Sequence, residues 1–323
     1  PFDVVLSQCC RHVGMLAWAM GGRVRTVVAV WVAVGVLSTP VVMRGWAMDV
    51  HRLLTARAVD GLPNAIKPLF VAHRAFIAEH SVDPDLWRVM ELTGGRGEEP
   101  PNHFLDMDFE EGATAPFLNI PREYADYVEK YGEGLATRYG RLPWRAEEVY
   151  NRLVTAFKDM SKPNAPYAAD NARYLMAVLA HYVEDAHVPF HGALNYDGQL
   201  TNQRGIHARF EGNLVLRNRD AWKWAPVKVT TITDFRAYMF DALVASQQLV
   251  ADVLAADRKA TASGGLYDAR YFAVFRQGAG PIAERRLNEA VSAVASAVHS
   301  AWVDAGRPAL PAGGSRTPAR LWQ

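Results

Sequence analysis

Apolar residues recur every three or four positions along most of the chain, which is the spacing of amphipathic α-helices. The strongest example runs from Asn171 to His187, where Tyr, Leu and Val side chains form a buried stripe. Only Val227–Ile232 has a β-like pattern. Further helices are predicted at residues 53–62, 66–80, 124–139, 146–160, 207–216, 234–258, 268–277 and 280–304. The pattern therefore predicts a mainly α-helical, all-α fold.

Two segments lack periodic apolar positions and are predicted to be loops. Residues 93–121 are rich in Gly, Pro and acidic residues, and residues 188–206 contain Pro, Gly and Asn. An Asp-Pro pair at 83–84 is expected to stop the helix before it. No internal repeat and no shift in composition marks a domain boundary, so we expect one multi-helix domain over residues 46–305. The Pro- and Gly-rich tail, residues 306–323, is predicted to be disordered.

The N-terminal residues 1–45 have the composition of a secretory signal rather than of the folded domain. Arginines precede an apolar stretch, Val27–Val42, which small residues follow. This stretch is short for a membrane span and contains Pro40, which favours a cleaved signal peptide over an uncleaved anchor. Met20 stands where such a signal would start, so residues 1–19 are interpreted as an untranslated leader. We expect the mature protein to be secreted or periplasmic.

The charge and the cysteine content of the chain limit which partners and metal ligands are possible. The net charge of +1 provides no general attraction to nucleic acid or to anionic membranes, so a polyanionic partner would need a local feature such as a metal. The two cysteines, Cys9 and Cys10, are adjacent and lie outside the expected domain. Neither a disulfide framework nor a thiolate zinc site is predicted. Any metal would be held by imidazole and carboxylate groups.

Histidine and carboxylate residues concentrate between positions 181 and 211. Residues four apart on a helix point to one side, so His181 and Asp185 can grip one ion or two neighbouring ions, and so can His207 and Glu211. His191 lies between the two pairs, just after a proline. One such pair alone is most often a surface contact, but three of the chain's ten histidines and two acids in this order favour a metal site.

This segment resembles a known family. The run H-Y-V-E-D-A-H-V-P-F-H at 181–191, followed by H-A-R-F-E at 207–211, is similar to the motif of the zinc-dependent phospholipase C and P-one-type nuclease superfamily. Upstream, Trp46-x4-His51 and N-H-F-L-D at 102–106 resemble the family's N-terminal Trp-His pair and its following loop. The similarity extends over about half of the chain, from Trp46 to Glu211.

The resemblance implies a single multi-helix domain of this kind and up to three zinc ions. The first would be bound by Asp85, His103, His181 and Asp185, the second by His191, His207 and Glu211, and the third by His51, Trp46 and Asp185. Asp83 is an alternative to Asp85, which we prefer because an Arg follows it three residues later. Asp185 would bridge two ions, and Asp85 would also orient or deprotonate the attacking water.

The third zinc depends on where the signal peptide is cut. In the family the mature N-terminal Trp contributes its amino group, which requires cleavage before Trp46. The better small-residue signal favours cleavage after Ala47, which would remove this ligand. The chain also has a longer segment between Asp85 and His103 than the family pattern leads us to expect.

The activity expected from the resemblance is metal-dependent hydrolysis of phosphodiesters by a monomer without other cofactors. Two substrates stay open. The Trp-to-His spacing favours a nuclease (endonuclease) acting on single-stranded nucleic acid, whereas Glu211 and the short loop before His207 favour a phospholipase C. The nuclease type is slightly favoured. An alternative from another class is a catalytically silent, zinc-stabilised exported module.

Overall fold

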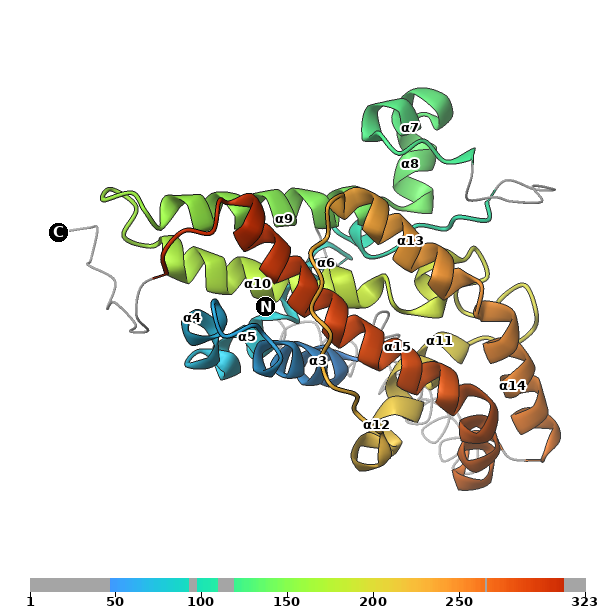
Figure 1. Ribbon diagram of the computed structural model, residues 1–323. Helices are drawn as coiled ribbons and strands as arrows, with labels where there is room; N and C mark the ends of the chain where they lie inside the picture. Colours follow the sequence, from blue (N-terminus) through green and yellow to red (C-terminus); the bar gives the residue numbers. More distant parts are fainter. Residues whose placement is uncertain (1–46, 93–97, 110–118, 265, 311–323) are drawn as a thin grey trace, which may run out of the picture. The chain divides into compact units, whose positions relative to one another are not determined.

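The computed structural model describes residues 47–92, 98–109, 119–264 and 266–310, which belong to one compact unit (Figure 1). Within these ranges the regular structure is helical, and the only β pairing is an isolated antiparallel bridge between Leu105 and Gly140. The prediction of an all-α fold is confirmed. The expected signal peptide, the leader and Trp46 lie outside the described residues.

The described residues form helices of widely different length. The longer ones are α3 (Met48–Asp60), α6 (Asp83–Leu92), α9 (Leu142–Asp159), α10 (Ala168–Asp185), α13 (Phe235–Gln247), α14 (Val250–Ala262) and α15 (Ala269–Asp304). The shorter ones are α4 (Lys67–Val71), α5 (Arg74–His80), α7 (Tyr124–Tyr131), α8 (Glu133–Tyr139), α11 (Ile206–Ala208) and α12 (Val215–Arg217). Single turns complete the set: η1 (Pro100–His103), η3 (Pro189–Gly192), the π-helical η4 (Arg209–Leu214) and η5 (Arg219–Ala221).

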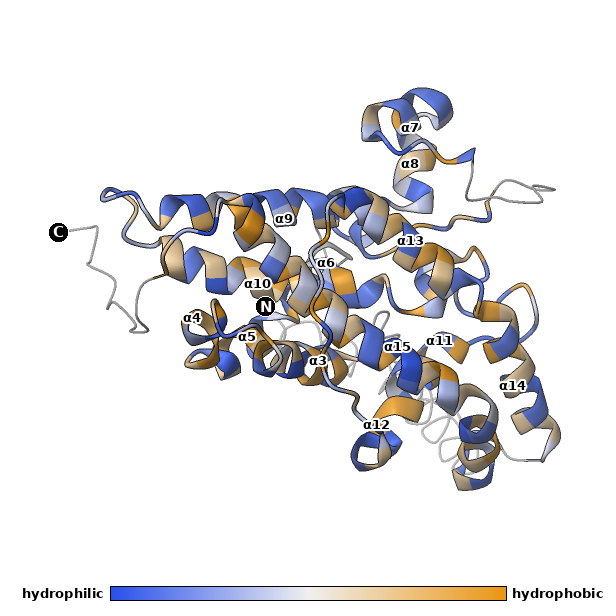
Figure 2. Cartoon of the chain, viewed as in Figure 1, coloured by the Kyte–Doolittle hydropathy of each residue, from blue (hydrophilic) through white to orange (hydrophobic). Residues whose placement is uncertain are grey.

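Helix α10 is the central element of the fold. It packs against α3, α5, α9 and α15, and every residue from Met176 to Asp185 is buried. A helix enclosed on all sides needs apolar residues around most of its circumference, which α10 has in its second half. The outer helix α9 has a largely hydrophilic visible side instead (Figure 2). Polar groups at the C-terminal end of α10 are therefore placed deep inside the molecule.

Three predicted helices are broken in the structure. The segment 66–80 forms α4 and α5, and 234–258 forms α13 and α14. The segment 124–139 is divided by Gly132, whose φ of 80° ends α7 in a conformation that costs glycine little. Apolar spacing continues across each break, so the periodicity alone did not reveal it.

One predicted break between helices, at residues 278–279, is absent from the structure. Residues 268–304 form one helix, α15, with Pro281 inside it. Gly280 precedes this proline and lacks the Cβ atom that would clash with the proline ring, so the helix continues. The helix before Asp83 and Pro84 does end at His80, as predicted, and Pro84 then lies in the first turn of α6, where a missing N–H group costs nothing.

The β-like segment Val227–Ile232 is extended but pairs with a helix. Backbone N–H groups of residues 223–232 donate to side chains spaced four residues apart on α15. The pairs are Lys223–Glu284, Ala225–Asn288, Lys228–Ser292, Thr230–Ser296 and Ile232–Ser300, at 2.7 to 3.2 Å. Four helical residues rise about 6 Å and two extended residues about 6.6 Å, so the two repeats stay nearly in register.

We expect Ser300→Ala to lower the free energy of unfolding by about 1–3 kcal/mol, because it leaves the buried N–H of Ile232 without its acceptor. Ser292→Ala serves as the control. Its partner, the N–H of Lys228, is exposed and can bond to water, so its cost should stay within about 0.5 kcal/mol. Chemical denaturation of both variants measures the difference, and equal effects would contradict the proposed role of the buried pair.

Candidate metal centre

Eight of the nine predicted ligands come together around the C-terminal end of α10. They form three buried groups, and within each group the donor atoms lie within 4.8 Å of one another. The groups are Asp85, His103 and His181; His51, His181 and Asp185; and His191, His207 and Glu211. Such buried sets of imidazole and carboxylate could hold metal ions. The ninth predicted ligand, Trp46, lies outside the described residues.

Asp185 lies at the middle of this arrangement and is fully buried. Its Oδ2 atom is 3.0 Å from Nδ1 of His103 and 3.2 Å from Nε2 of His181. Its Oδ1 atom is 3.6 Å from Nε2 of His51 and 3.6 Å from Nδ1 of His191. Each oxygen therefore faces a different group, which is the geometry that a carboxylate shared between two ions needs.

The third group is built on a short helical turn. His207 belongs to α11 and Glu211 to the π-helical η4, and Nε2 of His207 is 2.9 Å from Oε2 of Glu211. Nε2 of His191, on η3, is 3.8 Å from the same oxygen. The predicted helix at 207–216 is thus replaced in part by a π-helix, a local form that is frequent at functional sites.

Three of the histidines have one ring nitrogen fixed by another group. Nδ1–H of His181 donates to the carbonyl of Ser81 at 2.8 Å, and Nδ1–H of His191 donates to that of His103 at 2.6 Å. Nδ1 of His51 bonds to Oε2 of Glu184 at 2.7 Å. Each ring therefore turns its Nε2 toward the acidic residues of the centre. Metal-binding histidines are typically held in this way.

Several buried atoms of the centre are unsatisfied without a cation. Among the described residues, Nε2 of His51, Oδ1 of Asp185 and Oε2 of Glu211 are buried and have no hydrogen bond of suitable geometry. Leaving such groups unbonded costs about 1–3 kcal/mol each. Divalent cations bound in these groups would satisfy the donor atoms, so the residues present fit a metal.

Burial and neighbouring charges set the protonation of the ligands. Burial raises the pKa of Asp185, but the adjacent His181 and His191 outweigh it and hold this pKa well below its usual range. Burial also lowers the pKa of His51 well below its usual range and that of His191 to about 4. These residues thus have the forms that bind metal, a carboxylate and neutral imidazoles.

His103 differs from these histidines. Burial lowers its pKa, but hydrogen bonds with Asp185 and Glu99 outweigh burial and raise the pKa to about 9. Its Nε2 lies 3.4 Å from Oε1 of Glu99, which also accepts a hydrogen bond from Tyr182 at 2.5 Å. A metal binding at this ring would therefore have to displace a proton.

The structure separates the two candidate aspartates. Asp85 is buried, belongs to the first group and pairs with Arg88 at 2.8 Å. Asp83 instead bonds to His80 at 2.8 Å and to the hydroxyl of Tyr174 at 3.1 Å, and belongs to none of the three groups. The geometry therefore favours Asp85, the preferred candidate.

The predicted loop at 93–121 is ordered where it meets the centre. The N–H of Leu105 donates to the carbonyl of His191 at 2.9 Å, and that of Met107 donates to Gly192 at 3.1 Å. Gly140 packs so closely on this strand-like piece that a Cβ atom there would lie 2.1 Å from the carbonyl oxygen of Phe104. These contacts hold His103 beside His191.

A cleft of about 560 Å³ opens onto the centre. Three of the eight predicted ligands line it, together with two arginines, several aromatic residues and two leucines. The three ligands are His103, His191 and His207, and the other residues are Arg88, Arg138, Phe104, Tyr139, Phe190, Tyr196, Leu194 and Leu200. Arginine and aromatic side chains beside a metal centre suit an anionic ligand that carries an organic group.

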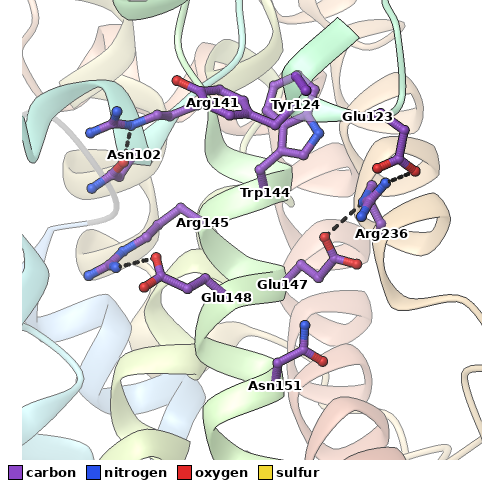
Figure 3. A pocket seen from close by; sticks show the side chains of 11 residues that line it. Asn102, Glu123, Tyr124, Arg141, Trp144, Arg145, Glu147, Glu148, Asn151 and Arg236 are labelled. Atoms are coloured by element: carbon purple, nitrogen blue, oxygen red, sulfur yellow. Dashed lines mark hydrogen bonds and ion pairs between the residues drawn. The ribbon is translucent and has the colours of Figure 1, made fainter. Parts of the chain in front are cut away.

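A second pocket of about 490 Å³ lies along α9 and contains none of the eight ligands (Figure 3). Its charged side chains bond to one another. Arg145 pairs with Glu148, Arg236 with Glu147 and Glu123, and Arg141 with Asn102. Arg88 of the cleft is also paired, with Asp85, so what sets the cleft apart is the presence of grouped histidines in its wall.

Two residues near the motif lie elsewhere than the sequence suggested. Glu184, a charged helix residue of the kind that usually faces solvent, is fully buried. Arg209, whose type is also usually exposed, is buried too, and it bonds to Asp257 at 3.1 Å and to the hydroxyl of Tyr271 at 3.1 Å. Those partners lie on α14 and α15, distant in sequence, so no local pattern could have indicated either environment.

Comparison with known proteins adds no further assignment. The chain matches no protein-family model and no curated protein. The likeness to the zinc-dependent superfamily therefore depends on the motif residues, together with the geometry that brings eight of them into three buried groups.

Proposed function

We propose that this protein is a zinc-dependent hydrolase that cleaves phosphodiesters. The observation that supports the proposal best is the position of Asp185, whose Oδ2 faces His103 and His181 while its Oδ1 faces His51 and His191. Ions held by shared ligands lie close together, and adjacent metal ions suit in-line displacement at phosphorus. The cleft beside them offers room and positive charge for a phosphate ester.

Zinc is the metal proposed because of the donor set. Every group is made of imidazole and carboxylate, a combination that catalytic zinc sites use, whereas magnesium and calcium sites use oxygen ligands. The three groups would bind up to three ions, the third of them with Trp46 if that residue becomes the mature N-terminus. Zinc supplies Lewis acidity, which activates water and withdraws charge from a phosphoryl oxygen.

Residues of the chain would position the substrate and move the proton. Asp85 is held by Arg88 and lies where its carboxylate can orient water or accept a proton. Arg88 also lines the cleft, and with Arg138 it can contact a non-bridging phosphate oxygen. Asp185 would fix the spacing of the groups that it joins.

The nuclease type is slightly favoured over a phospholipase C. The Asp85–Arg88 pair, which the nuclease-like pattern led us to expect, is present at 2.8 Å. Aromatic residues of the cleft, among them Phe104 and Tyr139, could stack on bases. Assays on single-stranded DNA or RNA and on phosphatidylcholine distinguish the two types, and a folded, zinc-loaded protein active on neither would refute both.

We expect Arg88→Met to lower kcat/KM for a phosphodiester by about 100-fold, since it removes a charge that faces the developing phosphate charge. Zinc content is measured alongside, because Arg88 is not among the grouped donors but pairs with Asp85, which is. Steady-state kinetics with bis(4-nitrophenyl) phosphate provide the measurement. Arg152→Gln, on the exposed side of α9, is the control. Unchanged kinetics in Arg88→Met would rule out this role for Arg88.

A further inference from the structure

Glu184 is a buried acid that none of the roles above explains. Its side chain is 0% exposed, and it lies between the inner ends of α3 and α10. Oε2 is 2.7 Å from Nδ1 of His51, and Oε1 accepts a hydrogen bond from the hydroxyl of Thr55 at 2.8 Å. Burying a carboxyl group is costly unless its oxygens are bonded. Both oxygens of Glu184 are bonded, and both partners come from α3.

The spacing of these residues connects Glu184 to the metal centre. His51 and Thr55 are four residues apart on α3 and so face the same side. Glu184 directly precedes Asp185 on α10. One ring of His51 thus bridges the two acids, with Nδ1 on Glu184 and Nε2 3.6 Å from Oδ1 of Asp185.

We infer that Glu184 is a positioning residue that holds His51 as a metal ligand. Its carboxyl group holds Nδ1 of His51 at 2.7 Å, which turns Nε2 toward Oδ1 of Asp185 and the ion that these two residues would bind. Thr55 in turn holds Glu184 by donating to its second oxygen. The inference depends on metal binding in the proposed function and does not depend on the substrate.

A contact that only stabilised the fold would not need a buried acid as the partner of a histidine ring. Nδ1 of His181 and of His191 is held by a backbone carbonyl, which requires no buried acid. At His51 a carboxyl group takes that place. A carboxylate behind an imidazole increases the basicity of the ring and its strength as a ligand. We therefore expect Glu184 to act on the affinity of one ion rather than on the fold alone.

The test measures zinc binding by the full chain after removal of metal, using equilibrium dialysis against buffered free zinc and counting zinc per chain. In Glu184→Gln the affinity for one ion should fall by about 10–100-fold, with the remaining ions unaffected. Thr55→Val should weaken the same ion by a smaller factor. Glu148→Gln, an exposed carboxylate on α9, is the matched control and should bind zinc as the wild type does.

Unchanged zinc affinity in a folded Glu184→Gln variant, judged by circular dichroism, would overturn the inference. If Glu184→Gln does not fold, the zinc affinity of Thr55→Val and the proton NMR spectrum of the wild type test the inference instead. In the zinc-loaded wild type, the Nδ1–H proton of His51 should appear far downfield and exchange slowly, and its absence would also contradict the inference. A wild type that binds no zinc would refute both proposals, whereas one that binds zinc without hydrolysing phosphodiesters would refute only the proposed function.

Discussion

Asp185→Asn is expected to reduce phosphodiester hydrolysis by about a thousandfold or more, the largest effect of any single substitution. Asp185 faces four histidines at 3.0 to 3.6 Å, and its two oxygens serve different groups. Asparagine keeps the shape of the side chain but has one oxygen and no charge, so it cannot join two ions. The measurements are kcat/KM for bis(4-nitrophenyl) phosphate and the zinc content of the purified variant.

A matched control lies on the same helix. Asp170 is a partly exposed aspartate in the first turn of α10 and pairs with Arg173. Asp170→Asn removes the same charge from the same helix without touching the metal centre, and its activity should stay within about twofold of the wild type, as surface changes usually do. Equal losses in the two variants would show that the charge of α10 matters generally, and would contradict the role given to Asp185.

Removal of metal is the second large effect that we expect. Without cations the buried donors His51 Nε2, Asp185 Oδ1 and Glu211 Oε2 are unsatisfied, which destabilises the folded state. A ligand present at a thousand times its Kd stabilises a protein by about 4 kcal/mol. Since each kcal/mol shifts the melting temperature of a protein of this size by about 2–4 °C, chelation should lower Tm by roughly 10 °C.

Calorimetry or circular dichroism with and without a chelator measures this shift. Zinc added back in excess should restore both Tm and hydrolysis, whereas calcium should restore neither, because the groups offer imidazole nitrogens that calcium does not prefer. A Tm that does not change on chelation would be inconsistent with metal ions in the buried groups. A Tm that falls, in a protein that hydrolyses nothing when loaded with zinc, would support the silent, zinc-stabilised module instead.

The sequence was most informative where local spacing determines geometry. His181 and Asp185 are four residues apart on a helix predicted at 171–187 and observed at 168–185, so their side chains had to share one side of it. The same argument held for His207 and Glu211, although a π-helix replaces part of the turn. His51, Asp85 and His103 were named only through the family resemblance, because no local rule relates residues so far apart.

Features that depend on long-range contacts could not be read from the sequence. Glu184 is polar and lies on a helix, which normally predicts exposure, and only the approach of α3 shows that it is buried against His51. Val227–Ile232 has the pattern of a strand, yet its backbone N–H groups bond to serine side chains of α15 rather than to another strand. The gap predicted between the helices 268–277 and 280–304 is absent, because α15 runs through both segments and continues past Pro281.

The tail predicted to be disordered over 306–323 is described as far as Leu310, which packs against the core. The rest of that tail, the expected secretion signal and the choice of mature N-terminus concern residues outside those that the structure describes. They stay predictions. Trp46 matters most among them, because it decides whether His51 and Asp185 share their ion with a further ligand. N-terminal sequencing of the exported protein would answer this point directly.

The most direct test of the proposed function is the rate of bis(4-nitrophenyl) phosphate hydrolysis measured as zinc is added stepwise to the metal-free protein. The account predicts no hydrolysis without zinc, and a rate that rises as the groups fill and levels off by three ions per chain. Absence of hydrolysis at every zinc load would contradict the account. Hydrolysis that persists in the metal-free protein would contradict it equally.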